Sequence, residues 1–151
     1  MPSASSVTCA YRSEYVPSRY AVATTPGTNH DAVAEHTFAL LLALAKNLVP
    51  QCNEVHAGRW PRQANLPLRG RTLGIAGLGR IGKAVAIRGA AFGMPLMAYE
   101  PYPDQAFVRQ YNVKLVPFER LLAESDFLSL HLPMSAESKH RSEAKRAQAP
   151  R

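Results

Sequence analysis

The feature that most constrains the fold is a glycine turn that follows an apolar segment. Gly77-Leu78-Gly79-Arg80-Ile81-Gly82 comes directly after Thr72-Leu73-Gly74-Ile75-Ala76 and opens an alanine-rich segment. At this spacing Gly77 permits a sharp turn, Gly79 leaves the backbone open to a pyrophosphate, and Gly82 lets a helix pack closely on a strand. The helix would begin with unpaired N–H groups directed at phosphates. The pattern predicts a dinucleotide-binding strand, turn and helix.

An acidic residue at the end of the next apolar run indicates which dinucleotide binds. Glu100 lies eighteen residues beyond Gly82, within the range expected for a ribose-binding carboxylate. Such a carboxylate accepts hydrogen bonds from the ribose hydroxyls and repels a 2′-phosphate, so we expect NAD rather than NADP. Arg80 can reach the pyrophosphate from inside the turn. The alternatives are a surface acid at a strand end and a solvated arginine in the first helical turn.

The rest of the chain predicts alternating strands and helices. Strands are expected at 72–76, 95–99, 114–116 and 127–131, and helices at 32–48, within 51–69, at 80–92 with Gly93 as its C-terminal cap, and at 118–123. Parallel neighbouring strands need such crossover connections. The predicted fold is therefore α/β, a Rossmann-type parallel sheet with flanking helices that is apparently incomplete.

The helix expected over Ala32 to Leu48 is unusual because its middle, residues 37–45, is apolar on every face. A helix of this kind should be buried on several sides, for example between domains or between subunits. Pro50 is expected to stop it.

Composition and charge argue against a nucleic-acid-binding protein, a membrane-spanning protein and a protein held by disulfides. The net charge is +7, but residues 136–151 hold five Lys or Arg against two Glu and so supply +3 of it, which indicates a solvated basic tail rather than a nucleic-acid surface. The longest apolar run, Phe38 to Ala45, is too short to span a membrane. Cys9 and Cys52 form no disulfide or metal pattern. A cytoplasmic protein with free thiols is expected, and no secretory signal is seen.

The motifs together resemble the D-isomer-specific 2-hydroxyacid dehydrogenase family. The resemblance is carried by Leu68 to Gly82, by Pro26-Gly27-Thr28-Asn29 followed by Ala32-Val33-Ala34-Glu35-His36, and by Glu124-Ser125-Asp126 with His131-Leu132-Pro133. It covers about residues 20 to 135. The resemblance implies an oxidoreductase that transfers a hydride between NAD and a small D-2-hydroxy acid, or the corresponding 2-keto acid.

The resemblance also implies roles for single residues. Arg80 and Ile81 match the family's pyrophosphate contacts, and Glu100 matches its ribose acid, which is usually Asp. Val33, Leu132 and Pro133 match positions that line the nicotinamide and adenosine ends of the cofactor. The apolar helix from Ala32 to Leu48 resembles the one at the family's dimer interface, so a homodimer is expected.

The two ends of the chain depart from the family. Residues 1–19, expected to be poorly structured, do not resemble its substrate domain, and residues 136–151, expected to be disordered, do not match its catalytic segment. We therefore expect a partial NAD-binding domain over 20–135, truncated at both ends, without the family's catalytic Arg, Glu and His. The alternatives are a non-catalytic dinucleotide-binding module that dimerises and a non-functional fragment with an open sheet edge.

No other site is expected from the sequence. General acid catalysis requires a histidine close to substrate and usually an orienting carboxylate, and His36, His56 and His131 do not stand in such a context. His30, Glu35 and His36 do not have the spacing of a helical zinc motif. We assign no catalytic residue and no metal ligand.

Overall fold

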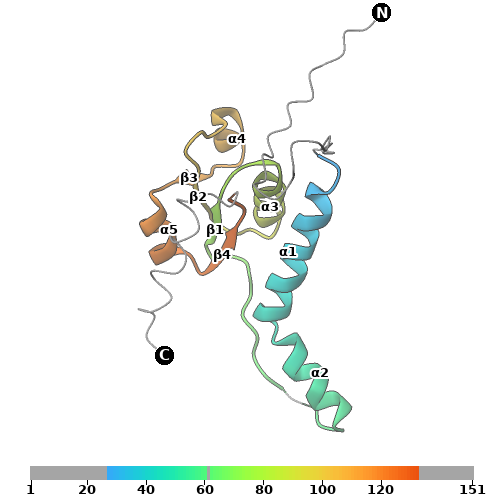
Figure 1. The fold of residues 1–151 in the computed structure, drawn as a ribbon. Helices are drawn as coiled ribbons and strands as arrows, with labels where there is room; N and C mark the ends of the chain where they lie inside the picture. The colour runs from blue at the N-terminus through green and yellow to red at the C-terminus, as the bar shows by residue number, and fades with distance from the viewer. Residues whose placement is uncertain (1–26, 61, 133–151) are drawn as a thin grey trace, which may run out of the picture.

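The computed structural model describes residues 27–60 and 62–132 (Figure 1). The segment predicted over 1–19, the tail predicted over 136–151 and Pro133 lie outside the described residues. The elements run in the order α1 (His30–Ala45), α2 (Leu48–His56), β1 (Leu73–Ala76), α3 (Arg80–Ala91), β2 (Leu96–Tyr99), α4 (Gln105–Gln110), β3 (Lys114–Leu115), α5 (Phe118–Glu124) and β4 (Phe127–Leu130).

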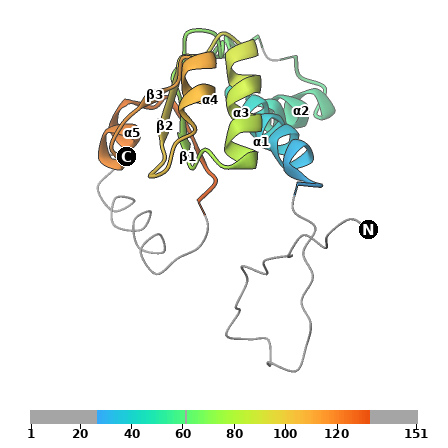
Figure 2. The ribbon, with the colours of Figure 1, turned by 90° about the horizontal axis from the view of Figure 1, so that it is seen from above.

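The strands form one parallel sheet in the order β3-β2-β1-β4. The order reverses beside β1, as it does in a Rossmann fold, where the ligand crevice lies at the carboxyl ends of the strands. Helices α1, α3 and α4 lie on one side of the sheet and α5 on the other (Figure 2). The predicted α/β Rossmann-type sheet with flanking helices is confirmed.

The core lies on both faces of β1, which is why this strand is apolar without alternation. All four residues of β1 are buried, and Leu73 and Ile75 have no exposed surface. Helix α3 packs closely on this strand because it has Gly89 at the contact, where an added Cβ would lie 2.6 Å from a methyl carbon of Leu73. Leu121 of α5 is fully buried in the cluster on the opposite face.

The prediction of one helix over Ala32 to Leu48, stopped by Pro50, is wrong in its boundary. Helix α1 ends at Ala45, and Asn47 takes a left-handed conformation with φ of 48°. Pro50 lies in the first turn of α2, where the missing N–H would have no helical partner in any case. The break therefore comes from Asn47, which tolerates the left-handed region better than other non-glycine residues.

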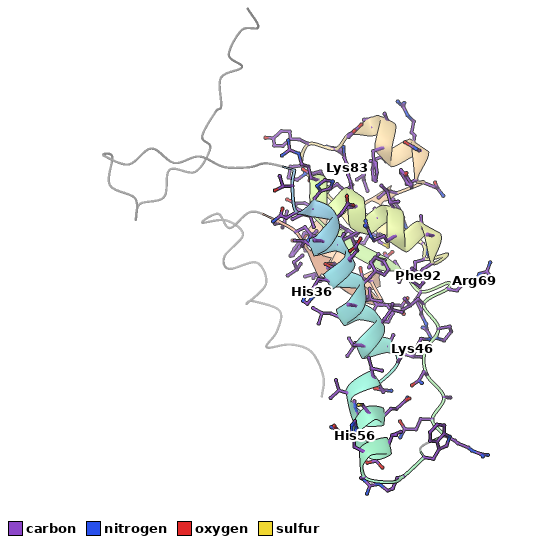
Figure 3. All side chains as sticks on the ribbon, turned by 90° about the vertical axis from the view of Figure 1, so that its right-hand side faces the viewer. His36, Lys46, His56, Arg69, Lys83 and Phe92 are labelled. Atoms are coloured by element: carbon purple, nitrogen blue, oxygen red, sulfur yellow. The ribbon has the colours of Figure 1, made fainter. Side chains whose placement is uncertain are left out.

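Among residues 27–60 and 62–132, helix α1 is covered on one face, so the expected burial on several sides is not provided by this part of the chain. Its buried residues are Ala34, Phe38, Leu41 and Ala45. Phe38 stacks on Phe92 at the end of α3, with ring centroids 5.2 Å apart and planes 14° apart, and Figure 3 shows Phe92 beside α1. Leu40 and Leu44, on the other face, are 60% and 72% exposed.

Helix α4 was not expected from the sequence, because its six residues are too few for a periodic pattern. Asp104 begins it by accepting hydrogen bonds from the N–H groups of Ala106 and Phe107. Its carboxylate also pairs with Lys83 of α3 at 2.7 Å. These contacts attach the β2–β3 connection to α3.

No single helix in residues 27–60 and 62–132 has the length and hydropathy needed to cross a membrane. Helices α1 and α2 meet that criterion only as a pair, which is bent by 62°.

The Glu-Ser-Asp motif before β4 fastens this strand to β1. The Asp126 carboxylate accepts from the N–H of Thr72 at 2.8 Å and from the Arg71 guanidinium at 3.2 Å. Ser125 lies over Gly74, where an added Cβ would come 2.0 Å from its Oγ. The hydrogen bond from Thr72 and the nearby Arg71 hold the pKa of Asp126 below its ordinary value, although partial desolvation opposes them.

We predict that Asp126→Asn lowers the melting temperature at pH 7 and removes part of the acid sensitivity of the fold. Because the folded-state pKa is lowered, the stabilisation is present above the unfolded value of about 3.9 and is lost as the pH falls through the folded value. Thermal melts of wild type and variant between pH 7 and pH 2.5 should converge at the acid end. Glu119→Gln, at an exposed carboxylate, should leave the melting temperature unchanged at both ends of this pH range. A difference in melting temperature between Asp126→Asn and wild type that stays constant at all pH values would contradict the prediction.

Candidate nucleotide-binding site

The glycine turn lies at the carboxyl end of β1, where the chain passes close to the end of β4. Gly77 has φ of +97°, and an added Cβ would lie 2.7 Å from the backbone oxygen of His131. At Gly82 an added Cβ would lie 1.9 Å from the backbone oxygen of Gly77. These two positions admit only glycine because backbone atoms, which cannot move aside easily, fill the space.

Gly79 lacks a side chain for a different reason. No atom lies within 4 Å of the position that its Cβ would take, and its φ of −66° and ψ of −164° are open to any residue. The turn therefore does not need glycine here for folding. The open backbone leaves room for a ligand to approach, which is the role predicted for the middle glycine of this motif.

Helix α3 presents its first turn to this open space. Its first backbone hydrogen bond runs from the N–H of Lys83 to the oxygen of Gly79, so the N–H groups of Arg80, Ile81 and Gly82 have no partner within the helix. The Arg80 side chain is exposed and has no hydrogen-bonding or ion-pair partner among the described residues. Ile81 packs against the core and fixes the turn. The first turn thus offers free donors and a positive charge to a phosphate.

Glu100 follows β2 directly and reaches the glycine turn. One carboxylate oxygen accepts from the N–H of Leu78 at 2.8 Å, and the other accepts from the N–H of Tyr102 at 3.1 Å. The carboxylate is half-buried and has no ion-pair partner in the described part of the chain. Each oxygen keeps a lone pair for a further donor, such as a ribose hydroxyl. The predicted ribose acid is thus held beside the turn by two backbone amides.

A cleft of about 340 Å³ lies over the turn. It is lined from three parts of the fold: the start of α1, the glycine turn with the start of α3, and the residue after β4. The lining residues are Gly27, Asn29, His30, Gly79, Arg80, Ile81, Gly82 and His131. The volume is within the range of small-molecule sites, and the open backbone and free cation suit a diphosphate. The residues present therefore fit the phosphate part of a dinucleotide.

His30 and His131 in this cleft were not predicted as site residues. His131 is half-buried, and this burial lowers the pKa of its imidazole, so it is neutral at pH 7. Its Nε2 lies 2.7 Å from the hydroxyl of Ser129, which orients the ring. The crossing of β1 and β4 brings His131 to the glycine turn. In the sequence the only signal for this residue was its place beside Leu132 and Pro133 in the motif that carries the family resemblance.

Three further residues were predicted to line the cofactor, and those that the structure describes lie around the cleft. Val33 lines a neighbouring groove of about 530 Å³ between α1 and β4, which shares His131 with the cleft. Leu132 packs against the cluster on the α5 side of the sheet. Pro133 lies outside the described residues. Whether Val33, Leu132 and Pro133 contact a cofactor stays a prediction.

We predict opposite effects for two glycine substitutions in the turn. Gly82→Ala should destabilise the fold by about 1–3 kcal/mol, because its Cβ overlaps the backbone of Gly77. Gly79→Val should leave the melting temperature unchanged but weaken NAD binding by about tenfold or more, because its side chain enters the space of the diphosphate. Thermal melts and calorimetric titration with NAD measure both effects. Equal melting temperatures for the two variants would refute this assignment of the glycines.

Comparisons of sequence agree with this geometry. Residues 38–149 match the family model described as D-isomer specific 2-hydroxyacid dehydrogenase, NAD binding domain. The chain is 41% identical over 125 residues to the glyoxylate reductase of Korarchaeum cryptofilum, covering 79% of this chain and 38% of the relative. It is 40% identical over 119 residues to the D-3-phosphoglycerate dehydrogenase of Archaeoglobus fulgidus, covering 78% of this chain and 23% of the relative.

Solved structures show the same similarity. The D-lactate dehydrogenase of Aquifex aeolicus, in complex with NAD and lactic acid, superposes with a TM-score of 0.74 at 34% identity over 78% of this chain and 36% of that one. The apo D-lactate dehydrogenase of Escherichia coli superposes with a TM-score of 0.71 at 30% identity over 77% of this chain and 37% of that one. The present chain thus spans less than two fifths of each of these relatives.

Proposed function

Because this chain belongs to the D-isomer specific 2-hydroxyacid dehydrogenase family and carries its NAD-binding domain, we propose that it binds NAD for hydride transfer to or from a small 2-hydroxy or 2-keto acid. The observation that carries the proposal is the open backbone at Gly79, next to Arg80, which has no side-chain partner among the described residues, and a carboxylate at the end of β2. The domain is proposed to extend over residues 20–135.

Each part of the site has a separate task in this proposal. The free N–H groups at the start of α3 bind the diphosphate, and Arg80 neutralises its charge. Glu100 accepts from the adenosine ribose hydroxyls and excludes a 2′-phosphate by charge repulsion. Val33, Leu132 and Pro133 are proposed to line the nicotinamide and adenosine ends. Bound NAD supplies the hydride acceptor, which the side chains alone lack.

In the proposed function, the described residues bind the cofactor and take no part in proton transfer. The relatives are named for different acids: glyoxylate, a 2-oxo acid, for glyoxylate reductase, and the 2-hydroxy acids D-3-phosphoglycerate and D-lactate for the two dehydrogenases. All are small acids with the oxidised carbon next to a carboxyl group, so this is the substrate class that we propose for the dehydrogenase to which the domain belongs.

We predict that Glu100→Gln weakens NAD binding by about tenfold and reduces the preference for NAD over NADP. The substitution removes the charge that repels a 2′-phosphate, while the amide oxygen can still accept from the N–H of Leu78. Calorimetric titration of the full chain with each cofactor measures the two affinities. Glu119→Gln serves as the control with the same chemical change at an exposed site. An unaltered ratio of the two affinities would remove Glu100 from the ribose site.

A second copy of this chain is the proposed partner of helix α1. The uncovered face of α1 carries Leu40 and Leu44, and α2 continues it with Leu48 and Val49, which are 58% and 65% exposed. The groove beside it is lined by Leu128 and Leu130 of β4 among other apolar side chains. A contiguous apolar surface of this kind marks an interaction site, and its position on the helix that resembles the family's dimer helix favours a homodimer.

We predict that the double substitution Leu40→Glu and Leu44→Glu converts a dimer to a monomer, because four carboxylates would then face one another in the interface. Light scattering after size-exclusion chromatography measures the mass. Gln105→Glu, on an exposed position of α4 rather than α1, should remain dimeric. If the wild-type chain is monomeric at about 100 μM, well above the Kd of a stable homodimer, the proposed interface is wrong.

A further inference from the structure

A nearly fully exposed aromatic ring follows the carboxylate that is assigned to the ribose. Tyr102 is 92% exposed, and its side chain has no hydrogen-bonding or ring partner among the described residues. Its backbone N–H donates to the Glu100 carboxylate at 3.1 Å. A single exposed aromatic residue is common on protein surfaces, but this one is distinguished by its position and by the backbone that carries it.

The Glu100 carboxylate connects Tyr102 to the glycine turn. Its Oε2 accepts from the N–H of Leu78 at 2.8 Å, and its Oε1 accepts from the N–H of Tyr102. The carboxylate therefore stands between the turn and the aromatic residue. In an adenine dinucleotide the ribose likewise stands between the diphosphate and the base. With the diphosphate at the turn and the ribose at Glu100, the base falls on the side of Tyr102.

The backbone that carries the ring is fixed before and after it. Pro101 and Pro103 hold their own φ, and Pro103 also restricts Tyr102 to extended conformations. Asp104 caps α4 with its carboxylate and pairs with Lys83 of α3 at 2.7 Å. Because this segment has little freedom left to lose, a ligand that stacks on the ring pays a small cost in conformational entropy.

We propose that Tyr102 is the platform on which the adenine ring of the cofactor stacks. This inference rests on the proposed binding of NAD and adds a residue that contacts the base. Stacking uses the flat face of the base and not its hydrogen-bonding edge. The phenol ring is therefore the part of Tyr102 that binds, and its hydroxyl is not needed.

The test removes the ring and the hydroxyl separately. Calorimetric titrations of the full chain with NAD and with ADP compare wild type, Tyr102→Ala and Tyr102→Phe. The loss of one stack between a base and an aromatic ring predicts that Tyr102→Ala weakens the binding of both ligands by about tenfold or more. Tyr102→Phe keeps the ring and should bind both ligands as wild type does. The melting temperatures should agree, because the ring is exposed.

Trp60→Ala is the matched control. Trp60 is 79% exposed on the connection between α2 and β1, and its removal should leave both affinities unchanged.

A second measurement on wild type needs no variant. The ring proton resonances of Tyr102 should shift upfield on addition of ADP, because these protons then lie over the adenine ring. They should not shift upfield on addition of ribose 5-phosphate, which has no base.

The outcomes separate this inference from the function on which it rests. Failure of wild type to bind NAD or ADP would reject the proposed function itself. If wild type binds, equal affinities for Tyr102→Ala, or Tyr102 resonances that stay in place with ADP, would reject the role of Tyr102 alone. Equal weakening in Tyr102→Ala and Tyr102→Phe would assign the contact to the hydroxyl and would also overturn the stack.

Discussion

The close backbone crossing between the glycine turn and the end of β4 is the constraint on which the rest of the structure depends. Gly77 lies against the backbone of His131, and Gly82 lies against Gly77 itself. Side chains cannot be accommodated at these contacts, so α3 begins close to the sheet, at the point where the strand order reverses. The same crossing brings His131 to the first turn of α3, and the packing of α1 on α3 brings the start of α1 there, so that the three segments line one cleft.

The three glycines of one motif therefore serve two different functions. Gly77 and Gly82 are required by packing within the chain, whereas Gly79 has open space beside it and is not required by packing, so we propose that it serves a ligand. Glu100 likewise has a structural task, because it holds the N–H groups of Leu78 and Tyr102. Binding and folding are thus linked at this turn, and only Gly79 and Arg80 can be changed with little effect on packing.

Helix α1 is apolar on both its covered and its exposed face. One face packs on α3 through Phe38, while Leu40 and Leu44 on the other face stay exposed beside the edge strand β4. The sequence showed that this helix is apolar all round, but a helical pattern does not state which faces are covered by the same chain. That information depends on how α1 meets α3, which is a long-range contact.

The sequence by itself determined the parallel α/β sheet, the position of the glycine turn and the acid at the end of β2, because these follow from local spacing and from the alternation of strands and helices. It also carried the family resemblance. The tertiary structure decided the break at Asn47, the short helix α4 and the composition of the cleft. His30 and His131 are distant from the turn in sequence, and only the packing of α1 and the β1–β4 crossing bring them together.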